Sequence, residues 1–413
     1  MRRHVTVSGN GHPRLPVVVH LRRRGSWGYL RLAWAGAGGE LEPPPGRSSG
    51  QSTAHGEGVM ETRETVKTAT GAAAAVPPLR IGGHSYWPPV FPAPMCGISD
   101  RPWRMLAREE GCPLVYTQMV SCEAMMRSGR DKSWGILDMF LEPGPVCAQV
   151  FGADPENLSE TARRLEQAGA TIVDLNMGCP VNKVVKANGG SALMTQPDLV
   201  RRIFRRMRAA LTVPFTVKFR AGWEKYGEEA FTVARLAEEE GLDAVAVHAR
   251  TRQQGFKCTA DWTIIRSLRE QVRLPVIGNG DVRSADDAER MIRDFGADGI
   301  MVGRAAMGNP WLLGAIVARL SGRPDPAPPT VDERLDTMLR HAEMMALRRG
   351  EELGLREFRK HVVCYMKAFP HARELKTRLM QCGTVAQYQE AVETFRPIIH
   401  EYLAQREEEP FPA

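Results

Sequence analysis

A regular alternation of short apolar runs and longer amphipathic segments begins near residue 90 and constrains the fold more than any other feature of the chain. Eight runs rich in β-branched or aliphatic residues are candidate strands: Val90–Met95, Leu114–Gln118, Val146–Phe151, Thr171–Leu175, Phe215–Arg220, Ala244–Arg250, Val276–Gly278 and Gly299–Val302. Intervening segments have helical periodicity: Glu156–Ala168, Pro197–Ala210, Gly227–Glu240, Ala285–Phe295 and Asn309–Leu320. This alternation predicts right-handed βαβ units, and eight units favour an α/β fold of the (β/α)8 TIM-barrel type over an open sheet.

Polar and reactive residues gather where the predicted strands end. They are Pro94-Met95-Cys96, Gln118, Gln149, Asn176–Cys179, Lys218 with Arg220, His248 with Arg250, Asn279-Gly280-Asp281, and Gly303-Arg304. In barrels of this kind the chemistry collects at the carboxyl ends of the strands. The pattern therefore predicts an enzyme.

The regions on either side of the barrel, which is predicted over 85–320, differ from it. A stiff, proline-rich break at 321–329 leads to residues 331–406, whose apolar spacing predicts a small helical bundle. Its expected helices are Thr330–Gly350, Gly354–Ala368, Ala372–Gly383 and Thr384–Gln405. Residues 1–80 are rich in Gly, Pro, Ser and Arg, so we expect a disordered extension there. An organelle transit peptide and a true start at Met60 are the open alternatives.

Composition is that of a soluble globular protein, with 43% apolar and 25% charged residues. No apolar run is long enough for a membrane span. The eight cysteines lack C-x-x-C spacing, which argues against a zinc site or a disulfide framework and predicts a cytoplasmic protein without a metal. Of the net charge of +7, residues 1–60 carry +5, so a nucleic-acid partner must be argued from local patches.

Cys179 is the candidate catalytic residue. It follows the predicted strand Thr171–Leu175 and a turn at Gly178, and Pro180 stiffens the chain after it. A cysteine on a loop at a strand end is presented to a ligand, although a small buried cysteine is the ordinary alternative. The polar neighbours of this segment favour a thiol that gives or takes a proton.

The last two strands predict a phosphate site, since the loops after them hold phosphate in many barrels. Gly280 and Gly303 would let the backbone approach, and Arg304 would add charge.

Lys218 lies inside an apolar strand and needs a partner, which an anionic flavin ring would provide. Gln149 could meet the polar edge of the ring, and His248 is a further candidate, equally consistent with a core histidine. No G-x-G-x-x-G follows a strand, so a nicotinamide would bind only transiently over the flavin.

The motif Ala93–Arg104 (APMCGISDRPWR) resembles the opening motif of the tRNA-dihydrouridine synthases. Asn176–Cys179 resembles their catalytic motif, and Asn188–Leu193 the loop behind it. Further motifs follow in the order and spacing of the family: His248–Arg252, Asn279–Asp281, Gly303–Ala305, and Arg359-Lys360-His361 with Tyr365 in the helical region. The resemblance covers about residues 85–400 and is closest to the bacterial B-type (nitrogen-regulation-like) branch.

This resemblance implies an FMN-dependent oxidoreductase acting on CH–CH bonds. NADPH or NADH would drive reduction of the C5=C6 bond of a uridine in tRNA to 5,6-dihydrouridine. Hydride would pass from flavin N5 to C6, and Cys179 would give its proton to C5. Such a thiol must be protonated at rest, and the target base must leave the tRNA stack. We expect a monomer, and the modified uridine and the preferred nicotinamide stay open.

The resemblance also implies roles for individual residues. The flavin would contact Pro94, Met95, Cys96, Gln149, Lys218 and His248, and its phosphate end Asn279, Gly280, Asp281, Gly303 and Arg304. Expected substrate contacts are Asn176, Arg250 and Arg252 at the rim, and Arg359 and Lys360 in the helical tRNA-binding domain, 331–406. Cys96 is a departure, because the family usually has alanine there. Two alternatives are a flavin barrel acting on free pyrimidines, as in the dihydroorotate dehydrogenases, and a non-catalytic RNA-binding protein.

Overall fold

The computed structural model describes residues 18–23, 26–31, 75–128, 138–139, 142–224, 226–367, 369 and 372–405. The chain divides into two compact units, 1–68 and 69–413. In the first, β1 (Val18–Arg23) and β2 (Ser26–Arg31) pair antiparallel. Most residues of the disordered extension predicted over 1–80 lie outside the described part of the chain.

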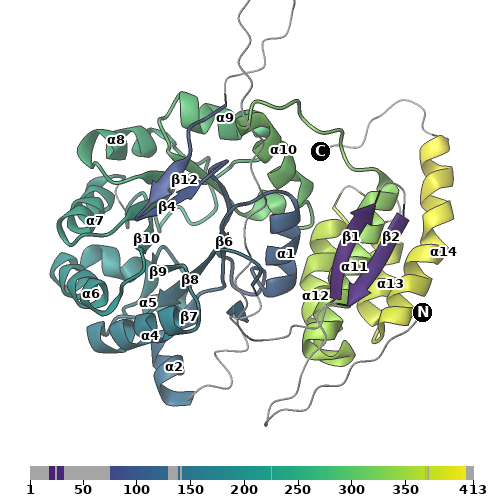
Figure 1. The fold of residues 1–413 in the computed structure, drawn as a ribbon, viewed down its shortest axis with the longest axis horizontal. Helices are drawn as coiled ribbons and strands as arrows, with labels where there is room; N and C mark the ends of the chain where they lie inside the picture. The colour runs from purple at the N-terminus through teal and green to yellow at the C-terminus, as the bar shows by residue number, and fades with distance from the viewer. Residues whose placement is uncertain are drawn as a thin grey trace, which may run out of the picture. The chain divides into compact units, whose positions relative to one another are not determined.

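Eight parallel strands form a nearly closed barrel in the second unit (Figure 1). They are β5 (Val90–Pro92), β6 (Val115–Tyr116), β8 (Val146–Phe151), β9 (Ile172–Met177), β10 (Phe215–Arg220), β11 (Ala244–His248), β12 (Val276–Asn279) and β13 (Gly299–Val302). Their spatial order, β5-β13-β12-β11-β10-β9-β8-β6, follows the chain around the ring, and β5 and β6 at its ends contact each other. The short β7 (Val120–Ser121) also pairs with β8. The predicted barrel is confirmed, with each strand where the sequence placed it.

Helices surround this ring. The five predicted ones are α4 (Pro155–Gln167), α6 (Pro197–Ala210), α7 (Glu228–Glu239), α9 (Ala285–Arg293) and α10 (Trp311–Leu320). Sequence reasoning did not identify α1 (Arg101–Glu109), the one-turn α5 (Asn182–Val185) or α8 (Thr263–Gln271), whereas α2 (Cys122–Ser128) lies in the segment 119–145, where it allowed a shorter or broken helix without bounds. The start of α1 has a clear local signal, because Asp100 caps the backbone N–H of Trp103 and a proline occupies the first turn.

The barrel interior is closed at its amino end and open at its carboxyl end. Strands β3 (Leu79–Ile81) and β4 (His84–Tyr86) form an antiparallel hairpin just before the first barrel strand. Their buried residues pack with inward-facing side chains of the barrel in one cluster, which includes Tyr86, Phe91, Tyr116, Ile277 and Met301. This apolar plug leaves only the carboxyl ends of the strands for a polar site.

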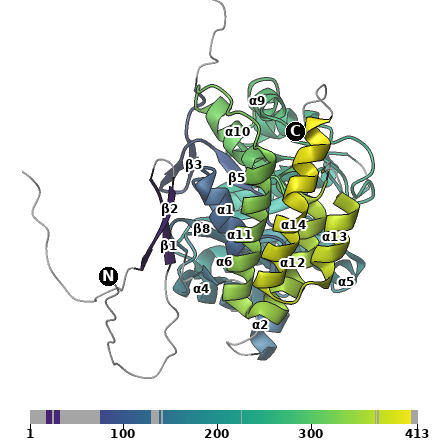
Figure 2. The same ribbon diagram turned by 90° about the vertical axis from the view of Figure 1, so that its right-hand side faces the viewer.

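The carboxyl-terminal region is helical, as predicted. It comprises α11 (Val331–Arg349), α12 (Glu351–Tyr365), α13 (Ala372–Gln381) and α14 (Val385–Ala404), which lie side by side in Figure 2. Capping boxes at Thr330 and Thr384 start the first and last of these helices. The region has its own core and contacts the barrel where α11 meets α1, beside an ion pair between Arg340 and Glu109. None of the described helices is long and apolar enough to cross a membrane.

Candidate active site

A cavity of about 710 Å³ opens at the carboxyl ends of the barrel strands. Its walls come from the loops after β5, β9, β12 and β13 and from side chains of β10 and β11, with Lys367 added by the helical region. The structure brings most of the predicted site residues together here: Pro94, Met95, Cys96, Asn176, Cys179, Lys218, His248, Asn279, Gly280, Asp281, Gly303 and Arg304.

Backbone hydrogen bonds fix the position of Cys179. The Oδ1 atom of Asn176 accepts from the N–H of Gly178 at 3.1 Å and from the N–H of Cys179 at 3.0 Å. On the other side, the Ser191 hydroxyl donates to the Cys179 carbonyl at 3.0 Å. The loop that carries Ser191 approaches closely because Gly190 has a φ of +60° and no side chain, whereas a Cβ there would lie 2.8 Å from the Cys179 carbonyl oxygen.

A buried polar chain holds Asn176 in turn. Its Nδ2 donates to Oε1 of Gln149 at 2.8 Å, and Nε2 of Gln149 donates to Asp174 at 2.7 Å. Gln149 is fully buried and is not among the residues that line the cavity. The structure thus places the Gln149 amide between Asn176 and Asp174 rather than at the cavity wall, and its predicted contact with a flavin ring stays a prediction. Burial raises the pKa of Asp174 to about 6, although the hydrogen bonds that its carboxylate accepts act to lower this pKa.

The surroundings of the Cys179 thiol favour its protonated form over the thiolate. Burial raises its pKa above the ordinary cysteine value, and the nearby Cys96 acts in the same direction. Hydrogen bonding at Val181 and the positive charge of Arg220 oppose this rise without reversing it. A protonated thiol at the cavity wall can act as a general acid.

Lys218 lies in β10, and its ammonium group reaches Asn279 at the end of β12. Its Nζ donates to Oδ1 of Asn279 at 2.9 Å, while Nδ2 of Asn279 donates to the Met301 carbonyl at 2.7 Å. Burial, followed by the positive charge of Arg220, lowers the pKa of Lys218 to about 8. No carboxylate forms an ion pair with it among the described residues, so its charge is available to an anionic ligand.

Positive charge is in excess throughout the cavity wall. The ionised side chains that line it are one carboxylate, Asp281, and five cations: Lys218, Arg220, Arg283, Arg304 and Lys367. Burial, followed by the positive charges of Lys218, Arg220, Arg250 and Arg304, lowers the pKa of His248 well below its usual range, so its imidazole is neutral. Burial, then the charge of Arg250, also lowers the pKa of Arg304. Such a wall favours an anionic ligand.

Phe256 is a site residue that sequence reasoning did not identify, and Arg220 is one that it placed at the strand ends without a role. The Phe256 side chain is 55% exposed at the cavity, with the guanidinium of Arg304 at 4.4 Å from its ring centre and that of Arg220 at 5.5 Å. Arg220 is nearly fully buried and donates to the carbonyl of Gly178 at 2.7 Å, next to the thiol. An aromatic residue within the polar loop after β11 was the available signal for Phe256.

Arg250 and Asp281 differ from their predicted roles. Arg250 is only 2% exposed, and its guanidinium pairs with Asp281 at 2.6 Å and bonds to the Cys258 carbonyl. Asp281 also accepts from the N–H of Ala260 at 2.9 Å. Arg250 therefore does not lie at the rim, and the carboxylate of Asp281, which lines the cavity, holds the wall together through Arg250 and Ala260. Arg252 is partly exposed, with its guanidinium 4.7 Å from the Trp223 ring centre, and does not line the cavity.

The helical region reaches the mouth of the site. Lys360 lies over the loop after β5, since a Cβ on Gly97 would be 3.4 Å from its Nζ. Arg359 is partly buried one position earlier on α12. The described ion pairs of this region involve other arginines, namely Arg340, Arg348, Arg349 and Arg396. A set of basic side chains outside those pairs remains, which we call the basic face: Arg356, Arg359, Lys360, Lys367, Arg373, Lys376 and Arg378.

Comparison with known proteins agrees with this site. The family model for dihydrouridine synthase (Dus) matches residues 91–400. A tRNA-dihydrouridine synthase B from Xanthomonas campestris pv. campestris is 38% identical over 306 residues, which are 74% of this chain and 92% of that relative. A protein of the same name from Pseudomonas aeruginosa is 36% identical over 318 residues, 75% and 95% of the two chains. A probable tRNA-dihydrouridine synthase from Rickettsia conorii is 37% identical over 298 residues, 72% and 90% of the two chains.

These matches span the barrel and the helical region together. They also confirm the resemblance to the B-type branch that the motifs indicated. The chain belongs to the dihydrouridine synthase family.

Proposed function

We propose that this protein is a tRNA-dihydrouridine synthase that reduces the C5=C6 bond of a uridine in tRNA. FMN would be its bound cofactor, and NADPH or NADH its reductant. The observation that carries the proposal is the Cys179 thiol, which is held by Asn176 at the wall of a cation-lined cavity and is kept protonated by burial.

The residues of the cavity fit a mononucleotide flavin. Five cations face one carboxylate, and burial together with neighbouring positive charge lowers the pKa values of Lys218 and Arg304, so an anionic group would stabilise their charged forms. Gly280 has a φ of +121°, and a Cβ there would lie 3.0 Å from the His248 ring, so only a glycine lets the backbone of this turn run at the cavity wall where a phosphate would bind.

We assign residues to the parts of this cofactor from their places in the cavity. Lys218, held by Asn279, would stabilise negative charge on the ring, and Arg304 with the Gly280 and Gly303 loops would hold the phosphate. Pro94, Met95 and Cys96 would form the wall beside the ring. When bound, FMN would supply the hydride that reduces C6 of the uracil.

The chain's own chemical contribution would be the proton for C5. Cys179 would donate it, because its thiol remains protonated and its backbone is fixed from both sides by Asn176 and Ser191. General-acid assistance of this kind typically contributes about 10²–10⁴ in rate. Arg220 would stabilise the resulting thiolate, since its guanidinium lies next to Gly178.

The basic face of the helical region would bind the tRNA backbone. Its cations are not used in the described ion pairs, and Lys360 and Lys367 bring it to the cavity. Phosphate contacts give affinity without sequence readout, whereas the target uridine would be selected by leaving the stack and entering the cavity.

Conversion of unmodified tRNA tests this function. The purified protein should be yellow, release FMN on denaturation, and form dihydrouridine in tRNA transcripts when NADPH is supplied. Free uracil and orotate should not be reduced. Turnover of the free pyrimidines with none on tRNA would instead favour the alternative of a pyrimidine-reducing barrel, and a flavin-free preparation would contradict the cofactor assignment.

A further inference from the structure

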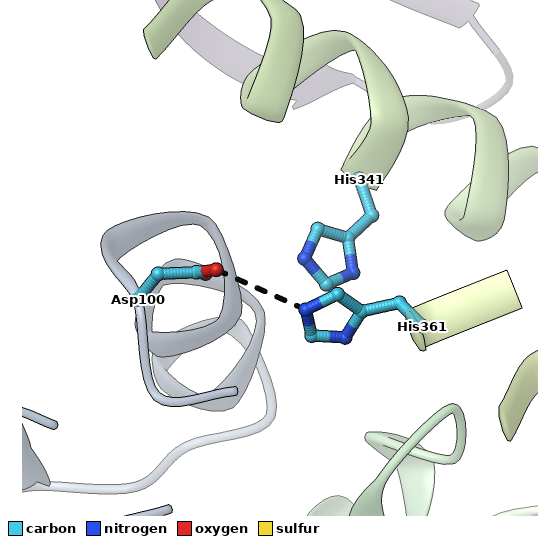
Figure 3. Close-up of side chains that lie close together, drawn as sticks. All are labelled: Asp100, His341 and His361. Carbon is cyan, nitrogen blue, oxygen red and sulfur yellow. Dashed lines mark ion pairs between the residues drawn. The ribbon is translucent and has the colours of Figure 1, made fainter. Parts of the chain in front are cut away.

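Three titratable side chains that the proposed reaction does not use meet where the barrel contacts the helical region. Asp100 caps the start of α1, whereas His341 and His361 come from α11 and α12, some 240 residues later in the chain. Figure 3 shows the carboxylate and the two imidazoles pointing toward one another. One ligand-type atom from each lies within 4.8 Å of the others. All three residues are at most 1% exposed.

The imidazoles of this cluster lack the hydrogen bonds that buried polar groups normally make. Neither nitrogen of His361 has a hydrogen-bond partner among the described residues, and the same holds for Nε2 of His341. Nε2 of His361 lies 3.8 Å from Oδ2 of Asp100, which is within ion-pair distance but too long for a hydrogen bond. Buried polar groups are almost always satisfied, so three unsatisfied nitrogens beside a carboxylate require an explanation.

We propose that Asp100, His341 and His361 bind a divalent transition metal, most suitably Zn²⁺. Two neutral imidazoles and one carboxylate are a ligand set that zinc prefers, whereas Ca²⁺ and Mg²⁺ select oxygen ligands. Ligands about 2.1 Å from a tetrahedral ion lie about 3.4 Å apart, so the 3.8 Å separation of His361 and Asp100 needs to close by only a few tenths of an ångström.

The surroundings orient the two other ligands for the same ion. Nδ1 of His341 lies 3.3 Å from the Tyr365 hydroxyl, which leaves Nε2 of His341 for the metal. Oδ1 of Asp100 accepts from the Trp103 N–H at 3.1 Å, which leaves Oδ2. The protein supplies three ligands, and a water molecule would complete a tetrahedral ion.

The ion would have a structural role, because its ligands are enclosed. Asp100 directly follows the loop that begins at Met95 and lines the cavity, and Met95 and Ser99 are bonded to each other across this loop. His361 is the neighbour of Lys360, which lies over Gly97 of the same loop. The metal would therefore fix the basic face relative to the loop that begins at Met95 and lines the cavity. The absence of C-x-x-C spacing does not bear on this cluster, since it contains no cysteine.

The test uses the full-length holoenzyme. The protein is stripped with a chelator and titrated with Zn²⁺, and zinc content is measured by plasma mass spectrometry. We expect saturation at one ion per chain. X-ray absorption of the zinc-loaded protein should show nitrogen or oxygen neighbours at about 2.0–2.1 Å and no sulfur shell at about 2.3 Å. Failure to saturate at one ion, or a sulfur shell, would overturn the proposal.

Variants locate the site. Asp100→Asn keeps a residue able to cap α1 but removes the carboxylate, and should weaken Zn²⁺ binding by at least about 100-fold, more than the loss of an outer hydrogen bond. Tyr365→Phe should weaken it by about 10–100-fold. His400→Gln is the matched control, because His400 forms an exposed pair with Asp332 at 3.0 Å in the same region.

Circular dichroism and flavin retention would show whether each variant folds. Wild-type zinc affinity in a folded Asp100→Asn protein would contradict the site. If a variant does not fold, the zinc stoichiometry and the X-ray absorption spectrum of the wild-type protein decide whether the site exists.

Discussion

The Oδ1 atom of Asn176 accepts a hydrogen bond from the backbone N–H of Cys179 at 3.0 Å, and this bond connects the barrel interior to the reactive thiol. Behind it, Gln149 and Asp174 extend the same chain of hydrogen bonds into the core. The position of the thiol is thus set by buried groups of two neighbouring strands, β8 and β9.

Replacing Asn176 by Ala should therefore misplace the thiol without removing it. We expect dihydrouridine formation to fall by about 10²-fold, because a displacement of about 1 Å in a catalytic group can cost that much. The measurement is single-turnover formation of dihydrouridine in tRNA. Asn157→Ala, on the outer helix α4, is the control and should leave the rate unchanged. An Asn176→Ala enzyme with the wild-type rate would show that this hydrogen bond does not position the donor.

The raised pKa of Cys179 predicts the pH dependence of the chemical step. A general acid works only while protonated, so the rate should fall as pH rises through the thiol pKa. Since burial raises that pKa, the rate should hold beyond about pH 8.5, where an ordinary cysteine is half ionised. Slow alkylation of Cys179 at neutral pH, relative to the exposed Cys258, is a second readout. A rate that declines from pH 7 would imply an activated thiolate instead.

Lys218 should destabilise the flavin-free protein and strengthen the binding of FMN. Its folded pKa of about 8 lies below the ordinary value of 10.5, so the unfolded chain holds this proton more tightly. The unfolding free energy of flavin-free wild-type protein should thus rise between about pH 8 and 10.5 relative to Lys218→Met. The same variant should bind FMN at least about tenfold more weakly, the loss expected for one charge-assisted hydrogen bond.

Chemical denaturation across this pH range and fluorescence titration with FMN measure the two effects. Lys257→Met is the control, since Lys257 is exposed and does not line the cavity. Unchanged FMN affinity in Lys218→Met would remove Lys218 from the cofactor site, whether or not the stability difference appears.

The basic face should control tRNA affinity and its dependence on salt. Replacing Arg359 and Lys360 together by Ala should weaken binding of all tRNAs and flatten the slope of log affinity against log salt by about two units. Reduction of bound FMN by NADPH should not change. Arg205→Ala with Arg206→Ala is the matched control, because both arginines are ion-paired on the outer helix α6. Equal slopes for the two double variants would move the RNA footprint elsewhere.

The sequence predicted those features of the structure whose signals lie within one short segment of the chain. Strands such as Val146–Phe151 and Phe215–Arg220 are mostly apolar runs, and the parallel pairing of the barrel strands brings the residues at their carboxyl ends to one edge. This is why Cys179, Lys218 and His248 could be assigned to a common site before any coordinates. Helix α1 was missed although its cap is clear, because only nine residues follow it.

What the sequence could not predict depends on contacts between distant segments. The burial of Gln149 against Asp174, and the pairing of Arg250 with Asp281, require the packed barrel. The same is true of Lys367, which joins the cavity from a different region of the chain. The side-chain type gives no indication of such partners, and for Arg250 an exposed rim position was the ordinary expectation for an arginine.

The most direct test of the account compares the two half-reactions in Cys179→Ala. The protein should still bind FMN, and NADPH should reduce it at the wild-type rate, because the thiol is not needed for that step. Dihydrouridine formation in tRNA, measured by mass spectrometry in a single turnover, should fall by about 10²–10⁴. Loss of the tRNA reaction alone is the predicted result. Wild-type dihydrouridine formation by Cys179→Ala would contradict the assignment of the proton donor, and Cys96 in the same cavity would then be the next residue to replace.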